Sequence, residues 1–153
     1  MAGGISFHVS ISGINELIGR MRGVPSWLPT WLSDTMTRSL RALQEAVPPY
    51  PPPPMGSKYV RTEKLGRSLG SGFGGGASGT PDIFEVTMSG GATEGRYGSR
   101  LGYAEYVVGE GTQAEVHAGI WWTVRTILNN ALKVIEALWS ALGERIAAYI
   151  NGS

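Results

Sequence analysis

The strongest structural signal in the chain is Trp121-Trp-Thr-Val-Arg-Thr-Ile-Leu-Asn-Asn-Ala-Leu-Lys-Val-Ile-Glu-Ala-Leu-Trp-Ser-Ala-Leu-Gly-Glu-Arg-Ile-Ala-Ala-Tyr-Ile150. Apolar residues recur in it at alternating spacings of three and four, which places them on one face of an α-helix. The pattern predicts a long C-terminal helix whose apolar face consists of Val124, Leu128, Ala131, Ile135, Leu138, Leu142, Ile146 and Tyr149.

Four further apolar residues, Trp122, Ile127, Val134 and Trp139, widen this face. A helix that is apolar over much of its circumference in a small domain is expected to be buried on two sides. We expect its own sheet to cover one side and a neighbouring copy of the chain to cover the other. Packing within the monomer explains the main stripe, whereas Trp139 and Val134 are candidates for a contact between copies.

The N-terminal part of the chain predicts one strand and two helices. Residues 5–11 alternate apolar and polar side chains, which is typical of a strand with one buried face and with His8 facing outward. Helical spacing then predicts a short helix from Ile14 to about Gly23. Because proline is tolerated only near a helix start, the next helix is expected from Pro29 to about Ala46. Its apolar face would carry Leu32, Met36, Leu40 and Leu43.

Proline and glycine dominate the middle of the chain and account for 9 and 23 of its 153 residues. The run Pro48-Pro-Tyr-Pro-Pro-Pro-Pro54 disfavours helix and ladder pairing, so residues 47–57 are predicted to form a stiff, extended arm. Residues 66–80 are rich in glycine, which loses much backbone freedom on ordering. We expect a flexible loop there that becomes ordered only beside a partner.

The remaining segments predict short elements. Residues 59–69 contain one helical turn with Thr62 as its cap and with Leu65 and Leu69 facing inward. Residues 83–88 and 96–101 are predicted strands joined by a turn at 90–91, and residues 103–108 continue the sheet or begin a helix. The fold class is therefore α+β, in one domain of residues 1–153. A small, mainly antiparallel sheet packs against a long N-terminal and a long C-terminal helix, with Pro/Gly-rich loops.

Composition excludes several kinds of chemistry. The chain has no cysteine and only two histidines, so thiol catalysis and Cys-based metal sites are excluded, and we expect no metal or cofactor. Glu105, Glu110 and Glu115 are spaced by five, which aligns them on neither a helix nor a strand face, so no acid/base pair is predicted. We also expect no signal peptide and no membrane-spanning segment. The chain is not predicted to be an enzyme.

The charges are few but unevenly distributed. Residues 1–80 hold eight Lys/Arg and four Asp/Glu, whereas residues 81–153 hold five and eight, around a net charge of +1. Lys58, Arg61, Lys64 and Arg67 are spaced by three, so a helix would gather them on one side. We interpret this patch first as solvated surface, then as a contact for an acidic protein surface, and last as a DNA contact.

Two motifs, in this order, carry a family resemblance. The proline run leads into Arg61-Thr-Glu-Lys-Leu-Gly-Arg-Ser68, and Tyr103-Ala-Glu-Tyr-Val-Val-Gly-Glu-Gly-Thr112 follows later, before the long C-terminal helix. Together they resemble the tail-completion or head-tail joining (neck) proteins of long-tailed bacteriophages. The chain departs from the family pattern at Glu63, where glycine is common, and at Gly119-Ile-Trp-Trp122, where a proline and an aromatic residue are usual.

The resemblance implies a non-enzymatic virion protein, assembled in the cytoplasm of the bacterial host. It would form a ring with copies of itself, a hexamer by resemblance, and contact the tail tube or tail terminator protein and the head connector or head-closure protein. DNA would at most pass through the lumen, and no membrane is involved. The expected interface residues are Pro48, Pro49, Tyr50, Pro51, Pro52, Pro53, Pro54, Tyr59, Arg61, Lys64, Arg67 and Trp139.

Other functions remain open at this level. Tail terminators and head-closure proteins have similar sizes. The prolines could instead recruit a domain with an aromatic-lined, proline-recognising groove, which would make the chain an adaptor. A membrane-surface helix is disfavoured because the last helix offers only Arg125, Lys133 and Arg145 as cations.

The C-terminal helix leads to a first prediction. Leu138→Asp should unfold the monomer, because it places an unpaired charge in the core. Trp139→Asp should spare the fold and weaken assembly, if Trp139 faces a neighbouring copy. Thermal unfolding followed by circular dichroism, together with native mass, compares the two variants, and equal loss of folding would show that both side chains are buried within the monomer.

Overall fold

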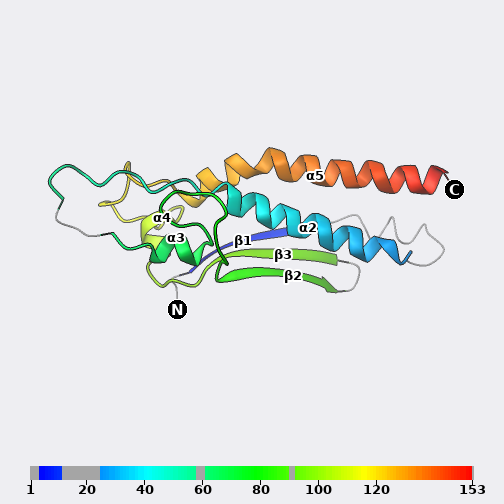
Figure 1. Cartoon of the computed structure of the whole chain (residues 1–153), viewed down its shortest axis with the longest axis horizontal. Coiled ribbons are helices and arrows are strands. Elements are labelled where there is room, and N and C mark those ends of the chain that lie inside the picture. The colour runs from blue at the N-terminus through cyan, green and yellow to red at the C-terminus, as the bar shows by residue number, and fades with distance from the viewer. Residues whose placement is uncertain (1–3, 12–24, 58–60, 90–91, 153) are drawn as a thin grey trace.

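The computed structural model describes residues 4–11, 25–57, 61–89 and 92–152 and shows an α+β protein (Figure 1). The short helix expected at 14–23 and the turn expected at 90–91 lie outside these residues. The elements are β1 (Ile5–Ile11), α2 (Trp27–Glu45), α3 (Lys64–Ser68), β2 (Ile83–Ser89), β3 (Ala92–Ser99), α4 (Ala104–Val108) and α5 (Val124–Gly152).

The sheet is antiparallel with strand order β1-β3-β2. Phe7 and Phe84 both pair with the buried Tyr97, and these aromatic residues lie on the apolar face of the sheet. His8 and Glu85 both pair with Arg96 on the solvated face, so the strand predicted at 5–11 and its outward histidine are confirmed. β3 begins at Ala92 rather than at the predicted Arg96, and it ends at Ser99. The sequence did not predict these bounds because the glycines of β3 hide the alternation of side chains that marks a strand.

Helix α2 covers the apolar face of the sheet and begins at Trp27, two residues before Pro29. It packs against the sheet at Gly95, where a Cβ atom would lie 2.6 Å from Met36 Sδ and 2.9 Å from Leu40 Cδ2. Met36 and Leu40 are fully buried. The absence of a side chain at residue 95 therefore sets how closely α2 approaches the central strand.

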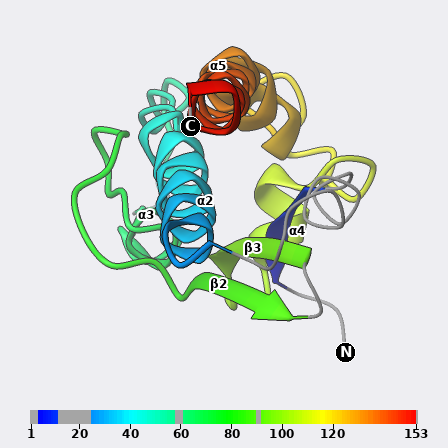
Figure 2. The same cartoon turned by 90° about the vertical axis from the view of Figure 1, so that its right-hand side faces the viewer.

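Helix α5 lies on the opposite side of α2 from the sheet, so the molecule has three layers (Figure 2). This corrects the expectation that the C-terminal helix packs on the sheet. α5 runs antiparallel to α2: Trp139 Nε1 donates to Ser39 Oγ at 3.0 Å near the middle of α2, and Tyr149 packs on Trp27 near its start. Thr35 and Ser39 are small and buried, which lets the helices approach closely.

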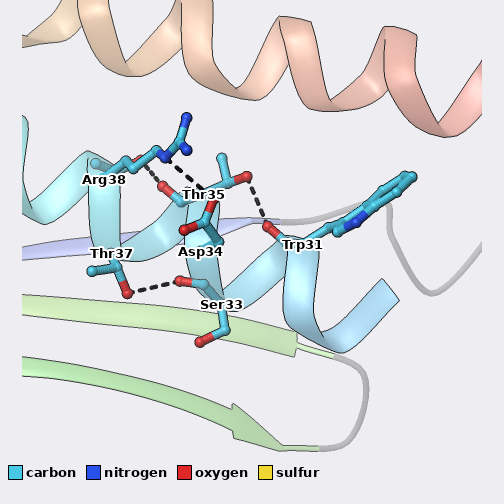
Figure 3. Close-up of polar contacts among 7 residues, drawn as sticks. Trp31, Ser33, Asp34, Thr35, Thr37 and Arg38 are labelled. Carbon is cyan, nitrogen blue, oxygen red and sulfur yellow. Dashed lines mark hydrogen bonds and ion pairs between the residues drawn. The ribbon is translucent and has the colours of Figure 1, made fainter. Parts of the chain in front are cut away.

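The hydroxyl groups of α2 are satisfied within the helix (Figure 3). Thr35 Oγ1 donates to the Trp31 carbonyl and Thr37 Oγ1 to the Ser33 carbonyl, both at 2.8 Å. This bonding to the preceding turn removes the cost of burying the Thr35 hydroxyl between the two long helices. An exposed ion pair, Arg38 Nε to Asp34 Oδ2 at 3.2 Å, adds only weak support.

The buried face of α5 differs from the predicted stripe at several positions. Ala131, Ile135, Leu142 and Ile146 are buried as expected, and Ile127 joins them. Leu128 is 39% exposed and Tyr149 is 50% exposed. Because α2 covers only one side of α5, the opposite side of the helix remains in solvent.

Trp139 packs within the monomer. Its side chain is half-buried, bonds to Ser39 and packs against both hydrophobic clusters of the molecule. The expectation that Trp139→Asp spares the fold is therefore replaced. We now expect this variant to destabilise the monomer, because the introduced carboxylate would place a charge beside the apolar core. Leu138 is half-buried and lies outside both hydrophobic clusters, so Leu138→Asp should destabilise the monomer less.

A buried glutamine at the end of α2 holds the glycine-rich loop of residues 66–80. Gln44 is fully buried, and its Nε2 donates to the carbonyls of Gly70, at 2.9 Å, and Gly79, at 2.8 Å. Tyr97 Oη donates to the Leu69 carbonyl at 2.6 Å where the loop begins. The loop thus has bonding partners within its own chain, which its composition did not indicate.

The contact at Gly95 leads to a second prediction. Gly95→Ala should lower the free energy of unfolding by about 1–3 kcal/mol, because the added methyl group would displace the side chains of Met36 and Leu40, which are fully buried. Gly102→Ala is the matched control, with open space around the added methyl group, and should change stability by less than about 0.5 kcal/mol. Urea denaturation measures both, and equal values would show that α2 does not limit residue 95.

Candidate functional site

The proline arm, residues 47–57, is anchored to the fold at its first residues. Val47 is buried and its carbonyl accepts from Gly76 N at 2.9 Å. Tyr50 N donates to the Phe73 carbonyl at 2.8 Å, and Trp122 Nε1 donates to the Pro49 carbonyl at 3.1 Å. The start of the arm is therefore fixed between the glycine-rich loop and the segment that precedes α5.

Tyr50 is the central anchor of the arm. Its ring packs on Phe73, with centroids 4.8 Å apart, and on Trp121, at 4.9 Å. Its hydroxyl accepts from Gly66 N at 2.8 Å and donates to the Thr62 carbonyl at 3.3 Å. Burial raises the pKa of Tyr50 above its ordinary value of 10.0. Tyr50, which was predicted as an interface residue, thus has contacts within the monomer that join the arm to α3 and to the aromatic residues before α5.

The far part of the arm is a solvent-exposed tip, residues 52–55. It lies at the end of the molecule opposite the C-terminus (Figure 1). The Met55 side chain is fully exposed, at 104%. A turn follows, closed by Ser57 N donating to the Pro54 carbonyl at 3.0 Å, with Gly56 at a φ of 81°. Only glycine adopts that φ without strain, so the turn holds Met55 outward.

The predicted basic patch does not form on one side of a helix. α3 begins only at Lys64 and follows Glu63 rather than the predicted cap Thr62, although Leu65 and Leu69 are buried as expected. The cations of the patch that the structure describes have different contacts. The Arg61 guanidinium lies 5.1 Å from the Trp121 ring centroid and donates to the Pro51 carbonyl, Arg67 pairs with Glu63 at 3.6 Å, and Lys64 is exposed. Lys58 and Tyr59 lie outside the described residues.

A pocket of about 490 Å³ opens beside the arm, and we call it the aromatic pocket. Four segments contribute to it: the arm, α3 with the residues just before it, α4, and the loop that leads to α5. Its volume is typical of ligand pockets, which span roughly 300–1,000 Å³. Its walls consist of Tyr50, Pro54, Ser57, Arg61, Thr62, Leu65, Tyr103, Tyr106, Val107, Val116, His117, Ile120 and Trp121.

Large apolar side chains remain exposed around the aromatic pocket. Tyr106 is 51% exposed and Val116 is 71% exposed, and Tyr103 and Ile120 are also exposed. With Met55 on the neighbouring tip they form a cluster at one end of the molecule. Scattered exposed apolar residues are ordinary, but a cluster around a concave pocket is typical of a binding surface.

The outer wall of the pocket is held in place by hydrogen bonds. Gln113 Nε2 donates to the Val107 carbonyl at 2.8 Å and to the Trp121 carbonyl at 3.3 Å, which joins α4 to the end of the loop. Arg125 Nε donates to Glu110 Oε1 at 2.7 Å and links the loop to the start of α5. The pocket is therefore present in the isolated chain rather than formed only on binding.

Sequence analysis missed most of this site. Tyr103 and Tyr106 belong to a quoted motif, and their spacing of three on one short helix was an available signal. Val116, His117 and Ile120 carried no signal, because they lie in a loop without periodicity. Of the predicted interface residues that the structure describes, Tyr50, Pro54 and Arg61 line the pocket and the others do not; Tyr59 lies outside the described residues.

The described residues 4–11, 25–57, 61–89 and 92–152 bring no three His, Asp or Glu side chains together as a possible metal site. None of the helices within those ranges is long and apolar enough to cross a bilayer. No protein-family model, curated protein or solved structure gives a significant match to the chain. The site is chemically a pocket lined by aromatic and other apolar side chains.

The bonding of Tyr50 leads to a third prediction. Tyr50→Phe keeps the ring contacts but removes both hydroxyl bonds, so it should lower the free energy of unfolding by about 1 kcal/mol near pH 7. Tyr106→Phe, at an exposed ring on the same pocket, is the control and should change stability by less than about 0.5 kcal/mol.

The same variants have an expected pH dependence. Because the pKa of Tyr50 is raised in the folded state, its contribution is present below about pH 10 and is lost as the pH rises above that value. Urea denaturation between neutral and alkaline pH should show a smaller alkaline loss in Tyr50→Phe than in the wild type. Part of the loss should remain, since burial also raises the pKa of Tyr97. An unchanged alkaline loss in Tyr50→Phe would contradict the assignment.

Proposed function

We propose that this chain is a structural subunit of a long-tailed bacteriophage. Copies of it form a ring at the head–tail junction or at the head-proximal end of the tail, which joins the tail tube to the head connector. The resemblance of the two quoted motifs supports the family. The cluster of exposed apolar side chains around the aromatic pocket is the structural observation that supports assembly.

The physical argument starts from solvation. A partner that covers exposed apolar surface gains roughly 25 cal/mol of binding free energy for each Å² that it removes from water. The exposed side chains here are Tyr103, Tyr106, Val116, Ile120 and Met55. Aromatic residues and Met are enriched at the centres of protein interfaces, and such residues in pockets carry much of the binding energy. The end of the molecule that carries the pocket is therefore the best candidate for a surface that is covered in an assembly.

The architecture fits a ring subunit under this proposal. A ring uses a heterologous contact, in which one surface meets a different surface on the next copy. The arm and the aromatic pocket are two such surfaces, and the excess of cations in residues 1–80 and of anions in residues 81–153 is compatible with their docking. The two long helices, the small sheet and the Pro/Gly-rich loops are, in this proposal, the architecture of a neck protein.

A second candidate function follows from the exposed prolines. Pro52, Pro53 and Pro54 are in solvent, where a domain with a proline-recognising groove can reach them. The chain would then be an adaptor. Replacing these three prolines with alanine separates the functions: an adaptor loses its partner and keeps its own oligomeric state, whereas in a ring subunit that uses the tip the oligomer weakens.

The fourth prediction tests the proposed function directly. Native mass measurement of the purified chain should give an oligomer several times heavier than the 16.3 kDa monomer, stabilised by tail tube protein. Peptide mass analysis of purified particles should detect the chain as a virion component. A chain that stays monomeric with tail tube protein present, and that is absent from virions, would contradict the proposal.

A further inference from the structure

The tip of the arm and the aromatic pocket have complementary chemistry. Residues 52–55 are three prolines and a methionine, all in solvent. Proline-rich segments adopt an extended conformation that costs little entropy to bind, and they dock in grooves lined with aromatic rings. Methionine adapts its shape to irregular pockets and makes favourable contacts with aromatic rings. The pocket offers such rings in Tyr50, Tyr103, Tyr106 and Trp121.

The tip does not fill the pocket of its own copy. Pro54 and Ser57 already form part of the pocket wall, and the turn closed between them directs Met55 into solvent. The other end of the arm is fixed by Tyr50, which bonds to Phe73 and lies in the same wall. Because both ends of the arm are held at the wall, the tip extends outward, toward whatever molecule faces this end.

From these observations we propose that the tip, Pro52–Met55, of one copy docks in the aromatic pocket of a second copy. The inference rests on the proposed self-assembly and names the contact that carries it. Each copy has one tip and one pocket, so it can give one contact and receive another, as ring closure requires. A four-residue tip covers little area, so a single contact is expected to be weak, and closure strengthens it because each subunit is then held twice.

Disulfide trapping tests the contact, because the chain has no cysteine of its own. We would mix the variant Met55→Cys with a mass-tagged variant, Val116→Cys, under mild oxidation. Val116 lines the pocket and is 71% exposed. Tagged Met88→Cys is the matched control, since Met88 is 42% exposed on β2 and does not line the pocket. The proposal expects a tagged disulfide dimer with Val116→Cys at least about fivefold more abundant than with Met88→Cys, since disulfides need Cβ atoms within roughly 4.5 Å.

The double variant Met55→Cys/Val116→Cys tests whether the tip instead docks in the pocket of its own copy. A disulfide within one copy, seen after oxidation as a denatured monomer lighter by two hydrogen atoms, would mean that the tip occupies its own pocket, which overturns the proposal. Equal trapping at Val116→Cys and Met88→Cys would overturn it as well. Circular dichroism checks that the exposed substitutions leave the fold intact.

A fifth prediction adds an affinity measurement by sedimentation or mass photometry. Met55→Asp and Val116→Asp should each weaken self-association about tenfold or more, as expected for residues central to an interface. Met88→Asp, at an exposed residue of β2, should change it by less than about twofold. If Met55→Asp has no effect while the wild type still forms an oligomer, the docking contact is wrong and the ring function stands. If the wild type is monomeric and absent from particles, both proposals fail. A closed dimer trapped through Met55 and Val116 would support the contact and contradict the ring.

Discussion

The burial of α2 on two sides is the constraint on which the rest of the structure depends. On one side Met36 and Leu40 close over Gly95 of the central strand, and on the other Ser39 accepts a hydrogen bond from Trp139 of α5. The sheet and α5 both pack chiefly against α2, so without this helix each of them would leave its apolar face in water. Gly95 of β3 on one side of α2, and Thr35 and Ser39 of α2 on the other, let the three layers approach closely enough to pack.

The same helix connects the core to the candidate site. At its end, Gln44 bonds to two carbonyls of the glycine-rich loop, and that loop supplies Phe73, which packs against Tyr50 in the arm. Tyr50 in turn forms a wall of the aromatic pocket. The position of the arm is therefore linked to the hydrogen bonds of the fully buried Gln44. A binding surface built on such supports is preorganised, which lowers the entropy cost of docking.

Periodicity predicted the elements that have one simple partner. The strand at residues 5–11, the strand at 83–88 and the long C-terminal helix follow from spacing alone. β3 was predicted too short, because Gly95 has no side chain to mark the buried face. Trp139 was assigned to a neighbouring copy because the spacing shows that a position is apolar and does not show what covers it. The pocket was missed because its walls come from segments far apart in the sequence, two of which lack any period.

By itself, the sequence determined the α+β class, the exclusion of cysteine chemistry and the long C-terminal helix. These properties are local, since they depend on spacing and on the backbone limits of proline and glycine. Only the tertiary structure decided that α5 lies on α2, that the glycine-rich loop is tied to Gln44, and that the arm lies beside an aromatic pocket. The reason is physical. A periodic apolar face indicates that this face must be buried, whereas shape and close packing among distant segments decide which surface buries it.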